Sequence, residues 1–175
     1  MTILAAYLDD KGCYFGSDTQ MSDLEEGPLD CGPKWIVWEK SAFGLAGYFP
    51  GMNLLQNYIA EPLDRLDLVG QIREILNEHG YEPEHKSGYE SWGCYGYYVT
   101  ATEAWDVDEL YSLLPLEKDK LHLMGSGSDA AKGADWMAED DDTLSPTERI
   151  INSVDAAIAV DFHSGGRVYY GKLLV

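Results

Sequence analysis

Residues 1–20 read MTILAAYLDDKGCYFGSDTQ, and this stretch decides the fold. An apolar run, Ile3–Leu8, is followed by a turn-forming Asp-Asp-Lys-Gly segment and by a second strand-like run, Cys13–Ser17. Two such runs joined by a short polar turn predict a β-hairpin. A hairpin returns the chain to the level at which it started. We therefore expect Thr2 and Asp18 to lie side by side at one end of it.

The next part of the chain predicts a second hairpin and then a pair of helices. A polar loop is expected over residues 23–33, because it holds two Gly-Pro breakers. Strand-like apolar runs then form a hairpin over residues 35–46. Apolar residues at helical spacing predict helices around residues 54–59 and 68–76. Residues 81–92 are polar and irregular, so another loop is expected there.

The rest of the chain, from about residue 95, is again predicted to form strands followed by two helices, with one more strand at the end. Strands are predicted over residues 95–113 and 121–124, a helix around 130–137, and a last strand over 168–175. A second helix begins at Ser-Pro-Thr-Glu, residues 145–148, where the serine caps, the proline fits the first turn and the glutamate completes a capping box. This order of elements predicts an α+β fold with four layers, α-β-β-α, in which two antiparallel sheets stack between helix pairs. A length of 175 residues suits one domain, 1–175.

The charge and cysteine content of the chain exclude some classes of binding partner and favour one cellular compartment. The chain has 31 acidic and 12 basic residues, for a formal charge of -19. Such a surface repels phosphate backbones and anionic headgroups, so we expect no nucleic-acid partner and no membrane partner. The cysteines Cys13, Cys31 and Cys94 have no metal-ligand spacing and are odd in number, which favours a reducing compartment. No cationic segment precedes the first apolar run, so a cytoplasmic protein is predicted.

Thr2 is a candidate nucleophile. Initiator methionine is normally removed before a small residue, and its removal would leave a hydroxyl beside a free α-amine. That amine has a pKa of roughly 7.7–8.0, so it can act as a base near neutral pH. A hydroxyl beside its own base is a self-contained activated nucleophile. A Met-Thr start alone is a weak signal, because many proteins begin this way without catalytic use.

Asp18 and Lys34 strengthen the hypothesis. Asp18 follows Thr2 by sixteen residues, and Lys34 follows Asp18 by the same number. Lys34 enters the third predicted strand, where it could reach both residues, favour ionisation of the Thr2 hydroxyl and lower the pKa of the amine by like-charge repulsion. Asp18 would hold the ammonium in place. The alternative is a surface turn aspartate and a surface lysine.

These residues resemble a known family. The segments Met-Thr-Ile-x-Ala, Gly-Ser-Asp and Pro-Lys-Trp resemble those of proteasome β subunits and of the bacterial two-component protease heat-shock locus V, which are N-terminal-nucleophile hydrolases. Phe-Gly-Leu-Ala-Gly at 43–47, Met-Gly-Ser-Gly at 124–127 and Asp-Phe-His-Ser-Gly-Gly at 161–166 also match, in the family's order. The resemblance therefore extends from residue 2 to about residue 168.

The resemblance implies roles for individual residues. Thr2 would be the nucleophile and its amine the base, while Lys34 and Asp18 tune and orient it. The Gly47 N–H would stabilise the oxyanion. Three further residues would hydrogen-bond the amine and Asp18: Ser126, Asp161 and Ser164.

The resemblance also implies how substrate and cations bind. The backbone of Ser22 would pair with an extended substrate, and Met21 would border the specificity pocket. Main-chain carbonyls of Ile158, Asp161 and Ser164 match a cation-binding turn, so a structural Na⁺ or Mg²⁺ is a candidate ligand. No cofactor is required for the reaction.

The function expected from this resemblance is that of a threonine-type endopeptidase. It would act on polypeptides inside a self-compartmentalising ring of identical subunits, with an ATP-dependent unfoldase as a candidate partner. Two alternatives stay open: an amidase of the same fold acting on small molecules, and a non-catalytic shell protein. Residues 60–94 depart from the compact bacterial protease and carry no family motif, so ring order, substrate preference and the removal of Met1 are left open.

Overall fold

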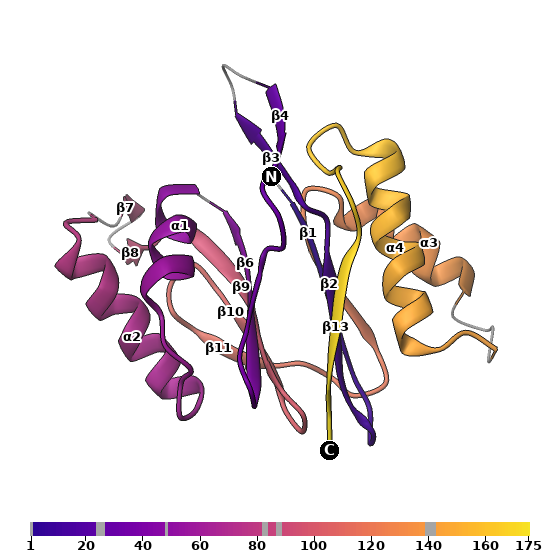
Figure 1. The fold of residues 1–175 in the computed structure, drawn as a ribbon, viewed down its shortest axis with the longest axis horizontal. Coiled ribbons are helices and arrows are strands. Elements are labelled where there is room, and N and C mark those ends of the chain that lie inside the picture. Colours follow the sequence, from indigo (N-terminus) through magenta and orange to yellow (C-terminus); the bar gives the residue numbers. More distant parts are fainter. Residues whose placement is uncertain (1, 24–26, 48, 82–83, 87–88, 139–142) are drawn as a thin grey trace.

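Two antiparallel sheets pack face to face, with a pair of helices on the outer face of each (Figure 1). This computed structural model describes residues 2–175 except 24–26, 48, 82–83, 87–88 and 139–142. The predicted α+β arrangement of four layers is confirmed. Among the described residues, no helix has the length and apolar character needed to cross a membrane.

The first sheet contains the hairpin predicted from the opening residues. Its strands, in spatial order, are β12 (Leu121–Gly125), β1 (Ile3–Leu8), β2 (Gly12–Ser17) and β13 (Tyr169–Leu174). Helices α3 (Ser128–Ala138) and α4 (Pro146–Val160) cover its outer face. The capping box predicted at the start of α4 is present, with the Ser145 side chain accepting from the Glu148 backbone N–H.

The second sheet is built from the middle of the chain. Its strands, in spatial order, are β11 (Leu113–Pro115), β10 (Ala104–Val107), β9 (Cys94–Thr100), β6 (Ser41–Gly47) and β5 (Trp35–Val37). Helices α1 (Phe49–Tyr58) and α2 (Arg65–Glu78) cover its outer face.

Alternation along β1 explains how one strand serves two layers. Ile3 and Ala5 pack toward α4, whereas Leu4 and Ala6 pack toward the second sheet, as expected for successive residues on opposite faces. All four side chains are fully buried. Buried apolar area contributes roughly 25 cal/mol per Å², so burial on both faces stabilises β1 within the sandwich.

Two segments predicted as loops contain short hairpins instead. Residues 23–33 overlap the hairpin of β3 (Gln20–Asp23) and β4 (Gly27–Asp30). Residues 81–92 contain β7 (Glu84–Lys86) and β8 (Tyr89–Ser91). Both are two-stranded sheets separate from the main sheets. In the sequence, these short segments lack an alternating apolar pattern, so they gave no signal of a strand.

Candidate active site

Strand register gathers the predicted residues at one end of the first sheet. In β1, Ile3 pairs with Gly125 of β12, and Leu4 pairs with Ser17 of β2, which in turn pairs with Tyr169 of β13. The residues just beyond these pairs must therefore lie at the same end of the first sheet. They are Thr2, Asp18, Ser126 and the loop that precedes β13. This end of the sheet lies toward the top of Figure 1, beside the point marked N.

Asp18 is the centre of a buried hydrogen-bond network. Its Oδ1 accepts from Thr2 Oγ1 at 2.7 Å, from Lys34 Nζ at 2.6 Å and from the Ile3 backbone N–H at 3.0 Å. Its Oδ2 accepts from the Gly165 backbone N–H at 3.1 Å. Thr2, Asp18 and Lys34 are only 3, 0 and 5% exposed. The alternative of a surface aspartate and a surface lysine does not describe this geometry.

Lys34 is placed by the backbone as well as by its side chain. Its carbonyl accepts the Leu45 N–H at 2.9 Å, which ties the start of β5 to β6. Burial lowers the pKa of the Lys34 ammonium, and the nearby Asp18 carboxylate offsets only part of that effect. The charge on Lys34 is thus held beside the Thr2 hydroxyl by a carboxylate oxygen that both groups share.

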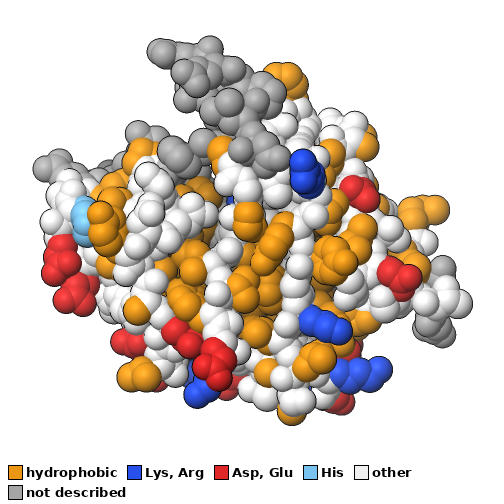
Figure 2. Space-filling view, viewed as in Figure 1, with side chains coloured by type: hydrophobic (Ala, Val, Ile, Leu, Met, Phe, Trp, Pro, Cys, Tyr) orange, Lys and Arg blue, Asp and Glu red, His pale blue; other side chains and the backbone are white. Residues whose placement is uncertain are grey.

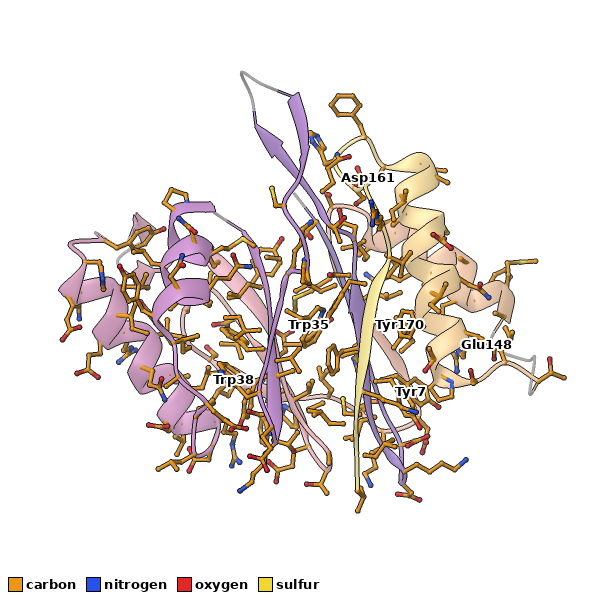
Figure 3. All side chains as sticks on the ribbon, in the orientation of Figure 1. Tyr7, Trp35, Trp38, Glu148, Asp161 and Tyr170 are labelled. Carbon is orange, nitrogen blue, oxygen red and sulfur yellow. The ribbon has the colours of Figure 1, made fainter. Side chains whose placement is uncertain are left out.

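Asp161 is the centre of a second network. Its Oδ2 accepts from Ser126 Oγ and from Ser164 Oγ, each at 2.7 Å, and its Oδ1 accepts from the His163 N–H at 3.3 Å. Burial raises the pKa of Asp161, but these hydrogen bonds, with the Ser164 bond the strongest, outweigh burial and lower it. A Cβ at Gly127 would lie 2.7 Å from Ser164 Oγ, so a larger residue would displace that hydroxyl. The sequence resemblance predicts that Ser126, Asp161 and Ser164 hydrogen-bond the α-amine and Asp18. Among the described residues these side chains bond one another, so that role stays a prediction. Figure 3 labels Asp161 near the end of α4.

The two networks are joined through the loop before β13. Ser164 bonds Asp161, and the next residue, Gly165, donates to Asp18. Thr19 clamps the same loop: its N–H donates to the Gly165 carbonyl at 3.2 Å, and its Oγ1 accepts from the Arg167 N–H at 2.9 Å. These contacts hold the second network against the first.

Sequence reasoning missed the roles of Thr19 and of the glycine pair. Gly166 has φ of 75°, and a Cβ there would collide with Thr19 Oγ1. Two consecutive glycines after the Asp-x-x-Ser segment were the available signal. Such a pair indicates a backbone that passes close to another chain segment.

Gly47 lies at the end of β6, on the sheet that faces Thr2. Strands β1 and β6 are in contact, and Figure 1 shows both reaching the upper end of the sandwich. The φ of Gly47 is 119°, and a Cβ would lie 2.5 Å from the Gly93 carbonyl oxygen. The position therefore requires glycine. No hydrogen bond joins Gly47 to the Asp18 network among the described residues, so its predicted part in oxyanion binding stays a prediction.

The predicted substrate-binding residues lie on the projecting hairpin. Met21 pairs with Leu29 and Ser22 with Pro28 in the β3–β4 ladder. One edge of β3 is thus already paired, and within the described chain no strand pairs with its other edge. The predictions for the Met21 side chain and for Met1 fall outside the described residues.

The predicted cation turn follows α4. Ile158 is in the last turn of this helix, and the Asp161 carbonyl accepts the Ser164 N–H at 3.1 Å. A carbonyl has two lone pairs, so this bond leaves the Asp161 oxygen able to bind a hard cation. Within the described part of the chain, no group of three His, Cys, Asp or Glu residues could hold a metal ion. A cation here would therefore depend on main-chain oxygens.

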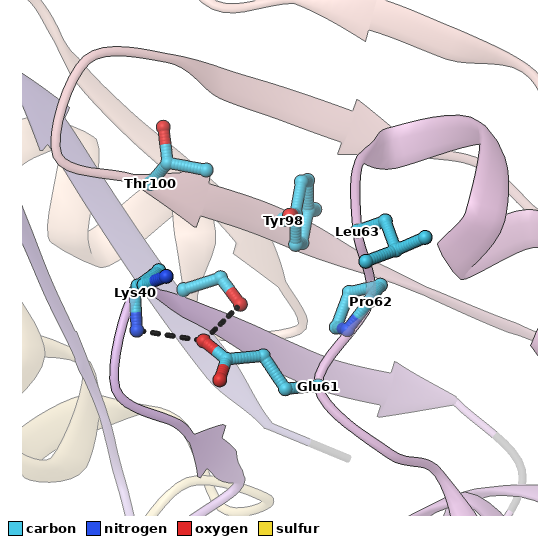
Figure 4. Close-up of a pocket in the computed structure, with 7 residues that line it drawn as sticks. Lys40, Glu61, Pro62, Leu63, Tyr98 and Thr100 are labelled. Carbon is cyan, nitrogen blue, oxygen red and sulfur yellow. Dashed lines mark hydrogen bonds between the residues drawn. The ribbon is translucent and has the colours of Figure 1, made fainter.

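A separate pocket of about 250 Å³ lies at the other end of the second sheet (Figure 4). Glu61 Oε1 accepts the Lys40 N–H at 2.6 Å within it. Ser41, Pro62, Leu63, Tyr98 and Thr100 complete its lining. It contains no residue of the Asp18 or Asp161 networks, so it is not part of the candidate active site.

No protein-family model matches the sequence, and no curated protein matches it either. Solved structures do match. BPH of Thiobacillus denitrificans in complex with epoxomicin is 19% identical, covers 99% of this chain and 98% of its own, and has a TM-score of 0.81. The eukaryotic HslV of Trypanosoma brucei is 16% identical, with coverage of 99% and 100% and a TM-score of 0.70.

A third match is a mutant of Anbu from Hyphomicrobium sp. strain MC1. It is 11% identical, covers 97% of this chain and 80% of its own, and has a TM-score of 0.73. The structural neighbours are thus proteasome-like proteins of the N-terminal-nucleophile hydrolase family. The chain has their fold over nearly its whole length.

Proposed function

We propose that this chain, which has the fold of proteasome-like hydrolases, is a threonine-type endopeptidase whose nucleophile is Thr2 after Met1 is removed. The observation that carries the proposal is the buried contact of Thr2 Oγ1 and Lys34 Nζ with one oxygen of Asp18. A buried ammonium and carboxylate are costly to desolvate, and their cost is more easily explained by chemistry than by stability.

The first half of the reaction forms an ester. Thr2 Oγ attacks the carbonyl carbon of the scissile amide, and the hydroxyl proton passes to the free α-amine of Thr2. The Gly47 N–H donates to the oxyanion that develops, an interaction worth roughly 10²–10³ in rate in other hydrolases. The C–N bond then breaks, the leaving amine takes the proton from the α-ammonium, and the acyl group remains on Thr2 Oγ.

The second half resolves that ester. Water attacks the ester carbonyl and gives its proton to the α-amine. The bond between the carbonyl carbon and Thr2 Oγ breaks, Oγ regains the proton, and the product leaves as a carboxylic acid. Lys34 favours the ionised form of Oγ throughout, and Asp18 holds Lys34 in place. The Asp161 network would orient the α-amine.

The substrate, assembly and site of action follow from the same proposal. We infer a polypeptide substrate that adds to the free edge of β3 through the Ser22 backbone, with Met21 beside its side chain. The enzyme would act in the cytoplasm as a ring of identical subunits supplied by an ATP-dependent unfoldase. A Na⁺ or Mg²⁺ at the Ile158, Asp161 and Ser164 carbonyls would be structural, and no cofactor is needed.

The nucleophile is tested by mass spectrometry of the purified protein. We expect the intact mass to lack one methionine and the trimmed protein to form an adduct with epoxomicin, since epoxyketones react with both the hydroxyl and the amine of an N-terminal threonine. Thr2→Ala should abolish the adduct. Thr102→Ala, which truncates an exposed threonine in a turn, is the matched control and should leave it unchanged. Correctly trimmed protein without an adduct would contradict the proposal.

Substrate comparison separates the alternatives. An endopeptidase should cleave an unfolded protein such as casein and an internally quenched peptide, with both activities lost in Thr2→Ala. Cleavage of small acyl amides alone would favour the small-molecule amidase. Retention of Met1 with no cleavage of any of these would favour the non-catalytic shell protein.

A further inference from the structure

The two outermost strands β5 and β13 lie side by side on one face of the molecule. Trp35 of β5 reaches across the sandwich: its Nε1 donates to the Gly16 carbonyl at 3.0 Å, and Gly16 pairs with Tyr170 of β13. Figure 3 shows Trp35 and Tyr170 near one another. Among the described residues, no strand pairs with the outer edge of either β5 or β13. We call this surface the β5/β13 edge.

The β5/β13 edge is apolar and lacks carboxylates. Orange side chains gather over its middle in Figure 2, and acidic ones lie around this patch, some of them just below it. Tyr170 is 54% exposed, and Val37 and Leu174 are exposed to a similar degree. Residues 34–38 and 167–175 contain no Asp or Glu, although the chain carries a charge of -19. Exposed apolar surface without like charges is typical of an interaction site.

The charges on the β5/β13 edge are positive. Arg167 and Lys172 are both exposed, and neither forms an ion pair with any residue that the structure describes. In a chain this acidic, two unpaired cations on one apolar face indicate a partner surface that is negative.

The opposite edge of the sandwich has the complementary character. There β11 and β12 are the outer strands, and we call this surface the β11/β12 edge. Leu114 of β11 is 59% exposed. Residues 106–120 carry five carboxylates and two lysines. Both lysines already face carboxylates, Lys118 with Asp10 at 3.0 Å and Lys120 with Glu117, so the edge is negative overall.

We propose that the β5/β13 edge of one copy of this chain docks onto the β11/β12 edge of a second copy. Contact between two like edges would oppose cation to cation or carboxylate to carboxylate, whereas contact between unlike edges pairs them and buries apolar side chains on both sides. Because the two surfaces differ, the contact is head to tail, and repetition closes a ring if the rotation allows it. This inference names the surfaces that would join subunits in the proposed ring, and it rests on the proposed function for the ring itself.

The proposal also places the active site beside the interface. Lys34 immediately precedes β5, and Gly165 and Arg167 lie in the loop before β13. A copy docked on the β5/β13 edge would therefore border the mouth of the Thr2 site. Substrate would be selected in part by residues of the neighbouring copy.

Charge insertion at each edge tests the contact. By light scattering, we expect the wild-type protein to have a mass greater than that of one subunit. Tyr170→Glu and Leu114→Glu should each fail to form the complete assembly. Leu66→Glu adds the same charge to an exposed position on the outer helix α2 and should assemble normally. Lys172→Glu is a second variant at the β5/β13 edge, should Tyr170→Glu fail to fold by circular dichroism.

Mixing the two variants gives the sharper result. Tyr170→Glu keeps an intact β11/β12 edge, and Leu114→Glu keeps an intact β5/β13 edge, so an equal mixture should form dimers of twice the 19.5 kDa subunit mass. A wild-type monomer, full assembly of Leu114→Glu, or a mixture without dimers would each overturn the proposal. Thr2→Ala should assemble like wild type, so loss of assembly and loss of catalysis are read separately.

Discussion

Asp18 accepts hydrogen bonds from four groups, which is about as many as the lone pairs of one carboxylate allow. Of its donors, the Thr2 hydroxyl and the Lys34 ammonium were predictable, because their side-chain chemistry and spacing stand in the sequence. The Ile3 and Gly165 backbone donors were not predictable, because every residue except proline carries an N–H. The register of β1 and the path of the loop before β13 decide which of them point at Asp18.

A first prediction concerns the energy of the Asp18–Lys34 pair. Removing one partner of a buried ion pair leaves an uncompensated charge, which costs roughly 3–5 kcal/mol of stability. We expect Lys34→Met and Asp18→Asn each to lower the free energy of unfolding by about this amount. The double variant should lose less than the sum of the two, as measured by urea unfolding. Strict additivity would mean that the two side chains are not coupled.

A second prediction concerns the titration of Lys34. Burial holds the pKa of Lys34 in the folded protein below its ordinary value of 10.5. At pH values between the lowered pKa of Lys34 in the folded protein and its ordinary pKa in the unfolded chain, the unfolded chain binds more protons than the folded one. The free energy of unfolding therefore rises with pH in this interval. The free energy of unfolding of wild type minus that of Lys34→Met should therefore increase as pH is raised toward 10.5. A difference that falls with pH would show that the pKa is raised instead.

Secondary structure was predictable wherever apolar periodicity or capping chemistry was present. The start of α4 at the Ser145 cap and the β1–β2 hairpin are examples, since each has a strong local signal. The β3–β4 hairpin was not predictable, because few of its residues are apolar and it includes Gly27 and Pro28, which ordinarily mark loops. The pairing of strands far apart in sequence, such as β2 with β13, depends on the packed layers and has no local signature.

A third prediction tests how β12 positions the nucleophile. Gly125 has φ of 108°, and a Cβ there would collide with the Thr2 carbonyl oxygen. We expect Gly125→Ala to destabilise the protein by at least about 1–3 kcal/mol and to reduce epoxomicin labelling. Gly133→Ala is the matched control, because Gly133 lies inside α3 with no neighbour near its Cβ position. That change should stabilise the protein by about 0.5–1 kcal/mol and leave labelling intact. Equal labelling of the two variants would contradict the role given to Gly125.

The molecule as a whole should unfold as one domain. A continuous apolar layer between the two sheets includes Leu4 and Phe15 from the first sheet and Trp35 and Val99 from the second. Neither sheet can expose its face of this layer without also exposing the facing side of the other sheet. We therefore predict a single cooperative transition in Tyr170→Glu, the variant designed not to assemble. Near-ultraviolet circular dichroism, which reports aromatic packing, and far-ultraviolet circular dichroism should give the same midpoint in urea. Two separated midpoints would divide residues 1–175 into more than one unit.

The clamp between Asp18 and Gly165 has a consequence for protein synthesis. The carboxylate that holds the candidate nucleophile is itself held by a backbone group 147 residues later in the chain. A nascent chain emerging from the ribosome has Thr2, Asp18 and Lys34 long before it has Gly165. We therefore expect the full set of hydrogen bonds to Asp18, and with it the geometry of the candidate active site, to be complete only after Gly165 has been synthesised.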